Sequence, residues 1–247
     1  MLLHPTLDKL KALKLEGMVS ALTDQETLSD ADTMSFEERL GLLVDREVTV
    51  RQSNKLKLRL SRAKLRQEAA IEDLDFGNGR NLDRSLILSL SSCDWIRKHD
   101  NCILTGPAGV GKSYLACALA NKACREGFDV LYYRVPRLFG EIAISKADGS
   151  YIRKLRAIAQ CDLLILDDWG IAPFTAEQRR DMLEVMDDRY SRRSTIVAGQ
   201  VPVEMWHEVI DDPTLADAIL DRLIHNAYKI ELRGESMRKL RSSLTSK

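Results

Sequence analysis

Hydrophobic residues make up 45% of the 247-residue chain and charged residues 30%, which supports a sizeable buried core and excludes a disordered chain. Lys plus Arg and Asp plus Glu are both 37, so the net charge gives no sign of wholesale nucleic-acid binding, although it can conceal a local basic patch. No segment is apolar enough to span a bilayer, and the five scattered cysteines form no zinc pattern. We expect a cytoplasmic protein with reduced thiols and no membrane partner.

The first 70 residues are expected to form a small all-helical domain. Ser35 followed by Glu38 predicts a capping box at the start of a long helix. The stretch KLKLRL at 55–60 alternates apolar and basic residues, a period that suits a strand. Its neighbours are good helix formers without a turn signal, so we predict that the helix continues through it.

A basic stretch lies inside this helical region. Between Arg46 and Arg66, eight Lys or Arg residues face one acidic residue, Glu47, and such a stretch attracts phosphates non-specifically. Aromatic residues are nearly absent, which argues against base stacking on single strands. The alternative is a solvated helix face without a ligand. The predicted DNA-binding residues are Arg51, Lys55, Lys57, Arg59, Arg62, Lys64 and Arg66.

Gly77, Asn78 and Gly79 predict a linker at 75–85, and strands alternate with helices beyond it. This alternation predicts an α/β domain over residues 71–247, with a five-stranded parallel sheet covered by helices. The strands are expected at 101–106, 129–134, 162–168, 194–199 and 227–232. The helices are expected at 111–127, 135–147, 151–160, 175–190, 203–209 and 214–225.

Residues 106–113, GPAGVGKS, match G-x-x-x-x-G-K-[ST] at every fixed position and lie between a predicted strand and a predicted helix. Glycines allow the backbone to approach phosphate, and loop amides and the helix N-terminus favour negative charge. Lys112 is predicted to bridge the β- and γ-phosphates, and Ser113 to ligate Mg²⁺. The alternative is a glycine-rich turn that happens to contain a lysine. The predicted nucleotide-binding residues are Gly106, Pro107, Ala108, Gly109, Val110, Gly111, Lys112, Ser113 and Tyr114.

The apolar run LLIL at 163–166 ends in Asp167 and Asp168, where a Walker-B carboxylate belongs. We predict that Asp167 binds Mg²⁺ and that Asp168 orients the attacking water. The alternative for Asp168 is a solvated residue at a strand end. Asp is shorter than the Glu usual at that position, so either the water lies closer or turnover is slow. Because no guanine-specific N-K-x-D loop is present, the expected nucleotide is ATP.

Two further polar residues are candidates for the hydrolysis site. Gln200 stands at the tip of the fourth strand, where it could bond the γ-phosphate or the attacking water. Arg222 stands on a helix just before the last strand, from which an arginine can reach the nucleotide of a neighbouring subunit. The alternative is a surface arginine paired with Asp217 or Asp221.

Several segments together resemble the IstB-like transposition helper ATPases, which are AAA+ proteins related to bacterial helicase loaders and to the replication initiator. The resemblance covers nearly the whole chain, and its most distinctive part runs from HEVIDDPTLADAILDRL to GESMRK. The family pattern usually has Thr-Ser before the sensor glutamine, whereas this chain has Ala198-Gly199. The segments are FEERLGLLVDRE, AKLR, LTGPAGVGKSYLACAL, LLILDDWG, the stretch 188–232 and GESMRK.

The resemblance implies a protein that binds double-stranded DNA with ATP, forms a ring or helical homo-oligomer, deforms the DNA and recruits a transposase. It implies slow ATP hydrolysis that DNA and oligomerisation stimulate, with residues 1–70 serving DNA binding and oligomerisation. Two other interpretations stay open: a helicase loader, and an ATP-gated scaffold that scarcely hydrolyses. Carried over by position, Lys112 and Ser113 serve phosphate and Mg²⁺, Asp167 the metal, Asp168 the water, Arg222 is a trans-acting finger, and Arg238 is a second sensor.

Overall fold

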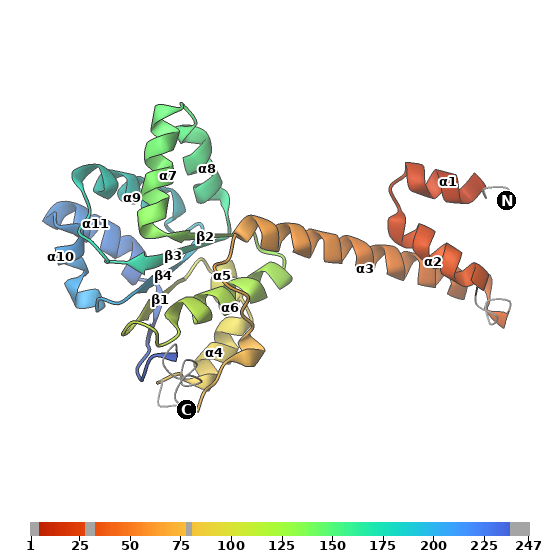
Figure 1. Cartoon of the computed structure of the whole chain (residues 1–247), viewed down its shortest axis with the longest axis horizontal. Helices are drawn as coiled ribbons and strands as arrows, with labels where there is room; N and C mark the ends of the chain where they lie inside the picture. Colours follow the sequence, from red (N-terminus) through yellow and green to blue (C-terminus); the bar gives the residue numbers. More distant parts are fainter. Residues whose placement is uncertain (1–4, 28–32, 78–80, 238–247) are drawn as a thin grey trace, which may run out of the picture. The chain divides into compact units, whose positions relative to one another are not determined.

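The computed structural model describes residues 5–27, 33–77 and 81–237. The chain divides into two compact units, which we call the N-terminal unit (Met1–Leu58) and the core unit (Arg59–Lys247) (Figure 1). The division falls inside the long helix α3 (Phe36–Ala63), whereas the sequence predicts a domain boundary at residue 70. No helix in the described ranges is long and apolar enough to cross a membrane.

The N-terminal unit is helical, as predicted. It contains α1 (Pro5–Ala12), α2 (Glu16–Thr27) and the first part of α3. The predicted capping box is confirmed, because the Ser35 amide donates to Glu38 Oε2 at 2.8 Å and the Glu38 amide donates to Ser35 Oγ at 3.2 Å. The stretch 55–60 is helical, also as predicted.

Glu47 holds α2 against α3. Its Oε2 accepts hydrogen bonds from the backbone amides of Gly17 at 2.7 Å and Met18 at 3.2 Å, and its Oε1 accepts from Arg51 Nε at 2.6 Å. The bond from Arg51 is the main cause that holds the pKa of Glu47 below its usual value. The one acidic residue of the basic stretch therefore has a structural role, and Arg51 is its ion-pair partner.

The core unit contains a five-stranded sheet in the order β2-β3-β4-β1-β5, and every pairing is parallel. This confirms the predicted fold class. Because β1, β4 and β3 are parallel, the phosphate loop after β1 and the carboxylates of β3 share the carboxyl edge of the sheet, one strand apart. The strands are β1 (Asn101–Thr105), β2 (Val130–Arg134), β3 (Leu163–Trp169), β4 (Ser194–Gly199) and β5 (Ala227–Glu231).

Helices cover both faces of the sheet (Figure 1). On one face α6 (Lys112–Arg125) contacts four of the strands and carries α4 and the short 3₁₀ turn Ile71–Asp73. The other face is covered by α7, α8, α9 and α11, over a buried cluster that includes Leu138, Ile142 and Trp169. These elements are α7 (Val135–Ala147), α8 (Tyr151–Gln160), α9 (Ala176–Arg189), the turn Val203–Met205, α10 (Trp206–Ile210) and α11 (Pro213–Ile224).

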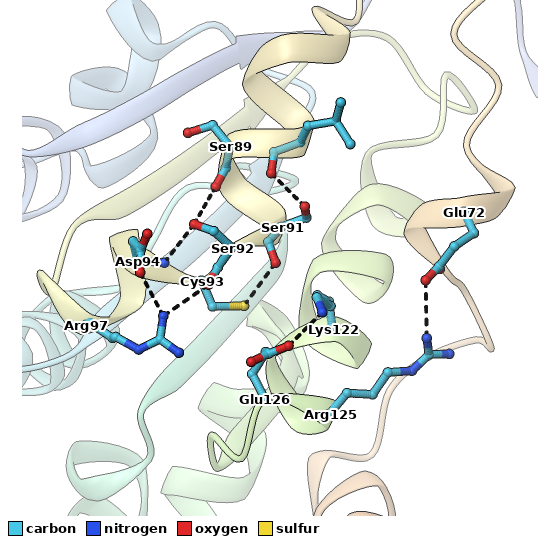
Figure 2. A network of polar contacts seen from close by, with 11 residues as sticks. Glu72, Ser89, Ser91, Ser92, Cys93, Asp94, Arg97, Lys122, Arg125 and Glu126 are labelled. Carbon is cyan, nitrogen blue, oxygen red and sulfur yellow. Dashed lines mark hydrogen bonds and ion pairs between the residues drawn. The ribbon is translucent and has the colours of Figure 1, made fainter.

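Two short helices before the sheet were not predicted: α4 (Arg84–Ser91) and α5 (Asp94–Arg97). Figure 2 shows the turn that joins them, in which the Ser92 hydroxyl donates to the Ser89 carbonyl and accepts from the Asp94 amide. Arg97 spans the turn by donating to the Ser92 carbonyl at 3.1 Å. Hydrogen bonds from serine hydroxyls to nearby backbone leave no apolar periodicity in the sequence. For this reason the sequence did not predict the turn between α4 and α5.

Gly17 of α2 and Gly41 of α3 differ in the space around them, and we predict opposite effects on stability when each is replaced by alanine. A Cβ on Gly17 would lie 2.5 Å from Glu47 Cα, whereas a Cβ on Gly41 would meet nothing within 4 Å. We expect Gly17→Ala to lower the unfolding free energy of the N-terminal unit by about 1–3 kcal/mol through backbone overpacking. Gly41→Ala should raise it by about 0.5–1 kcal/mol because alanine favours the helix. Hydrogen exchange of α2 and α3 amides in the full chain measures both, and equal effects would contradict the predicted clash.

Candidate nucleotide-binding and hydrolysis site

The predicted phosphate loop joins β1 to α6. Lys112 is the first residue of α6, and its buried ammonium donates to the carbonyls of Gly106 at 2.7 Å and Pro107 at 2.8 Å. Burial lowers the pKa of Lys112, and the carboxylates of Asp167 and Asp168 oppose that shift. The loop therefore holds its cation at the carboxyl end of the sheet.

The segment after β5 packs directly against this loop. The Leu232 amide donates to the Thr105 carbonyl at 2.8 Å, and the Met237 amide donates to the Gly109 carbonyl at 2.9 Å. Gly109 has a φ of +84°, and a Cβ there would lie 2.2 Å from Ser236 Oγ. A glycine at position 109 is therefore needed for the close packing of the C-terminal segment as well as for the phosphate loop. Arg238, the predicted second sensor, lies outside the described residues.

A bulge near the end of β3 brings the two carboxylates together. Leu166 pairs with Val197 and Trp169 pairs with Gly199, so β3 holds one more residue than β4 over this interval. Asp168 takes up the extra length with a left-handed φ of 61°. In a regular strand, adjacent side chains point to opposite faces. Here one guanidinium nitrogen, Arg66 Nη1, lies 3.4 Å from Asp167 Oδ2 and 3.8 Å from Asp168 Oδ2.

Two residues of β2 also contact the carboxylates. The Tyr132 hydroxyl donates to Asp167 Oδ2, and Arg134 forms an ion pair with Asp168. Burial and the bond to Asp167 raise the pKa of Tyr132 well above its usual value, so the hydroxyl remains a donor. Sequence analysis did not place Tyr132, Arg134 or Arg66 in this site. A signal existed for Arg134, because it ends the strand that pairs with β3.

A cavity opens beside the loop, lined by Gly109–Leu115 and by residues from segments before and after the sheet. These residues are the polar Gln67, Asp73 and Asp75 and the apolar Leu74, Leu82, Leu232 and Met237. Tyr114 belongs to this lining, and its role in nucleotide binding stays a prediction. Leu74, Leu82 and Leu232 were missed by the sequence analysis because they are far from the loop in the chain. A cavity next to a phosphate loop that combines apolar walls with a few polar groups can accept the base and sugar of a nucleotide.

The remaining two predicted catalytic residues lie at opposite edges of the sheet. Gln200 directly follows β4 and is exposed at the carboxyl edge, between the phosphate loop and the β3 carboxylates. Arg222 is in the last turn of α11, before β5 begins, and is therefore at the amino edge. A five-residue strand spans roughly 16 Å, so Arg222 is too far away to serve the loop of its own chain.

Asn101 fixes the position of Arg222. Its Nδ2 donates to the carbonyls of Arg222 at 3.0 Å and Leu223 at 3.2 Å, while its Oδ1 accepts from the Thr195 amide at 2.9 Å. The Arg222 guanidinium forms an ion pair with Asp187, not with the two acids considered in the sequence analysis. A role in a neighbouring subunit stays a prediction.

Comparison with known proteins identifies the family. The sequence profile described as "IstB-like ATP binding protein" matches residues 8–245. The chain belongs to the IstB-like family. An insertion sequence ATP-binding protein of Sinorhizobium fredii, y4pL, is 52% identical over 97% of this chain and 98% of the relative.

Solved structures share the fold of this IstB-like chain. DnaI superposes with a TM-score of 0.59 at 24% identity, covering 67% of this chain and 92% of DnaI. The DnaC helicase loader superposes with a TM-score of 0.52 at 16% identity, covering 64% of this chain and 95% of DnaC. The core unit of the IstB-like chain therefore shares the fold of these structures, with a parallel five-stranded sheet and the phosphate loop between β1 and α6.

The basic residues of the IstB-like chain differ in their surroundings. Arg59 Nε donates to the Cys124 carbonyl at 2.9 Å, and Arg66 contacts the β3 carboxylates. Both guanidinium groups are thus engaged within the core unit. The other side chains predicted to bind DNA are exposed: Arg51, with its Glu47 partner, and Lys55, Lys57, Arg62 and Lys64.

Two leucines in the cavity wall, Leu74 and Leu82, allow a test of nucleotide affinity. We expect Leu74→Ala and Leu82→Ala each to weaken binding of ATP and ADP alike, by about 3- to 10-fold, because each removes apolar surface from a wall remote from the γ-phosphate. Titration calorimetry with both nucleotides measures this. Leu88→Ala is the matched control, since Leu88 is exposed on α4 and outside the cavity. A loss for ATP alone would place the γ-phosphate, not the base, at this wall.

Proposed function

We propose that this chain is an ATP-dependent duplex-DNA-binding ATPase that assembles on target DNA and recruits or activates a partner transposase. The observation that supports the ATPase part is that Lys112 follows β1 at the start of α6 while Asp167 and Asp168 end β3, at the same edge of a parallel sheet. A phosphate-binding cation and a carboxylate pair at one sheet edge are the parts that phosphoryl transfer to water needs.

The oxygen donors of the site fit Mg²⁺. Asp167 provides a buried carboxylate, and Ser113 provides a hydroxyl in the first turn of α6. When bound, Mg²⁺ would neutralise the charge of the β- and γ-phosphates. Lys112 would turn its ammonium from the loop carbonyls to the phosphates. Asp168 would accept a hydrogen bond from the attacking water once Arg134 releases it.

The partners in this proposal have separate support. The name of the y4pL relative, an insertion sequence ATP-binding protein, supports a role in transposition and hence a transposase partner. The exposed basic residues of α3 support binding to duplex DNA through phosphates. The position of Arg222 at the amino edge supports a homo-oligomer, ring or helical filament, in which it serves the nucleotide of a neighbour.

Specific observations favour two other functions. The likeness of fold to DnaI and to the DnaC helicase loader favours a helicase loader, although a likeness below 25% identity concerns the fold alone. The ion pair between Arg134 and the short Asp168 favours an ATP-gated scaffold with little hydrolysis, because it occupies the carboxylate that would orient water.

Two substitutions separate binding from hydrolysis. We expect Lys112→Ala to weaken ATP binding by at least about 100-fold, because it removes the buried cation of the loop. Asp168→Asn should leave binding within about 3-fold while lowering DNA-stimulated turnover about 100-fold, because the amide cannot act as a base. Nucleotide titration and phosphate release measure these effects, with exposed Glu208→Gln as control. Normal turnover by Asp168→Asn would remove Asp168 from catalysis, and no turnover by the wild type would favour the scaffold.

The DNA interface is tested by paired substitutions of equal charge. We expect Lys55→Ala/Lys57→Ala and Arg62→Ala/Lys64→Ala to weaken binding to all duplex sequences alike. Each pair should reduce the slope of log affinity against log salt by about 1.8, since each phosphate contact contributes about 0.9. Lys9→Ala/Lys11→Ala removes the same charge from exposed positions on α1 and is the control. If the control pair had the same effect, the interface would not be specific to α3.

A further inference from the structure

Arg66 lies in the predicted hydrolysis site, although its sequence neighbours are basic residues of the helical arm. It follows the end of α3 by three residues, after a turn in which Lys64 has a left-handed φ of 51°. Its Nη1 is 3.4 Å from Asp167 Oδ2 and 3.8 Å from Asp168 Oδ2. The guanidinium thus contacts both carboxylates of the pair.

Buried residues on either side hold the segment of Arg66 in the core unit. Ala63 is 0% exposed and Ala69 is 5% exposed. Gln67 lines the cavity beside the phosphate loop. The oxygen of Asp167 that Arg66 contacts, Oδ2, also accepts a hydrogen bond from the Tyr132 hydroxyl. The segment of Arg66 is therefore held by its buried neighbours, while its side chain keeps 36% exposure and can move outward.

The charges of this cluster are balanced by the protein itself. Asp167 and Asp168 carry two negative charges, and Arg66 and Arg134 carry two positive charges within contact distance. A divalent cation that approaches Asp167 Oδ2 would meet the guanidinium of Arg66 on that oxygen. Like charges a few ångströms apart repel strongly where water is partly excluded.

We propose that Arg66 is a positioning residue that competes with Mg²⁺ for the Asp167 carboxylate, so that it sets how much Mg²⁺ the chain needs to bind nucleotide. This inference rests on the proposed function, in which ATP binds with Mg²⁺. Before loading, Arg66 neutralises the carboxylates and so reduces their repulsion of the nucleotide phosphates. As Mg²⁺ and nucleotide bind, Arg66 leaves Asp167 for solvent.

The test is binding of a fluorescent ATP analogue to the full chain, titrated with Mg²⁺ and repeated in EDTA. We expect Arg66→Gln to lower the Mg²⁺ concentration for half-maximal binding by about 5- to 20-fold, because the competing charge is gone. In EDTA the same variant should bind nucleotide more weakly than wild type, because the carboxylates are no longer neutralised. Arg66→Lys keeps the charge and should stay within about 3-fold of wild type in both measurements.

Arg66→Gln is expected to need less Mg²⁺ for nucleotide binding but to bind nucleotide more weakly in EDTA. These opposite effects distinguish the proposed role from a merely structural one. If Arg66 only supported the fold, Arg66→Gln would weaken binding in Mg²⁺ and in EDTA together, which would overturn the proposal. An unchanged Mg²⁺ requirement would overturn it as well. Arg66→Leu is a second neutral variant, and its Mg²⁺ requirement and its binding in EDTA must agree with those of Arg66→Gln. Arg125→Gln removes a charge at the exposed end of α6 and must behave as wild type. Figure 2 shows Arg125 paired with Glu72.

The wild-type chain separates failure of this inference from failure of the proposed function. If wild type binds the analogue in a Mg²⁺-dependent way and Arg66→Gln does not shift that dependence, only the inference fails. If wild type binds no nucleotide at any Mg²⁺ concentration, the proposed function fails and the inference fails with it.

Discussion

Two adjacent carboxylates at the end of a buried strand are the constraint around which the core unit is arranged. A charged group removed from water needs partners, and Asp167 is only 1% exposed. The sheet order places β2 beside β3, so that Tyr132 and Arg134 supply a hydroxyl and a guanidinium. Lys112 approaches from the phosphate loop across β4, and Arg66 approaches from the segment before the sheet.

The same constraint shapes the neighbouring backbone. The bulge that turns Asp168 toward Asp167 also brings the Trp169 carbonyl close to β4, where a Cβ on Gly199 would lie 2.9 Å from it. Gly199 is thus the residue that the bulge requires at this position. This gives a physical reason for one of the two places where the chain departs from the Thr-Ser that the family resemblance leads one to expect. Ala198 is completely buried within β4, and the structure gives no further reason for alanine at this position.

Much of the fold could be predicted because its signals are local. Each of the five strands was predicted to within about a residue, since short apolar runs between turn residues are typical of a buried parallel sheet. Residues 55–60 were correctly predicted as helix because their neighbours favour helix. The turn between α4 and α5 was missed because Ser92 and Arg97 stabilise it through hydrogen bonds, which leave no periodic pattern. The walls of the cavity were missed because Leu74 and Leu82 reach the loop only in the folded chain.

The sequence by itself determined the phosphate loop, the carboxylate pair, the parallel α/β class and the family resemblance, because each depends on residues close together in the chain. Only the tertiary structure decided what surrounds them. Arg66 and Asp167 are 101 positions apart, and their contact depends on where α3 ends and on the bulge in β3. The structure also decided that Glu47 and Arg51 form a structural pair and that Arg222 lies at the edge opposite the loop. A linear pattern records which charges are present, whereas strand order and helix packing determine which of them meet.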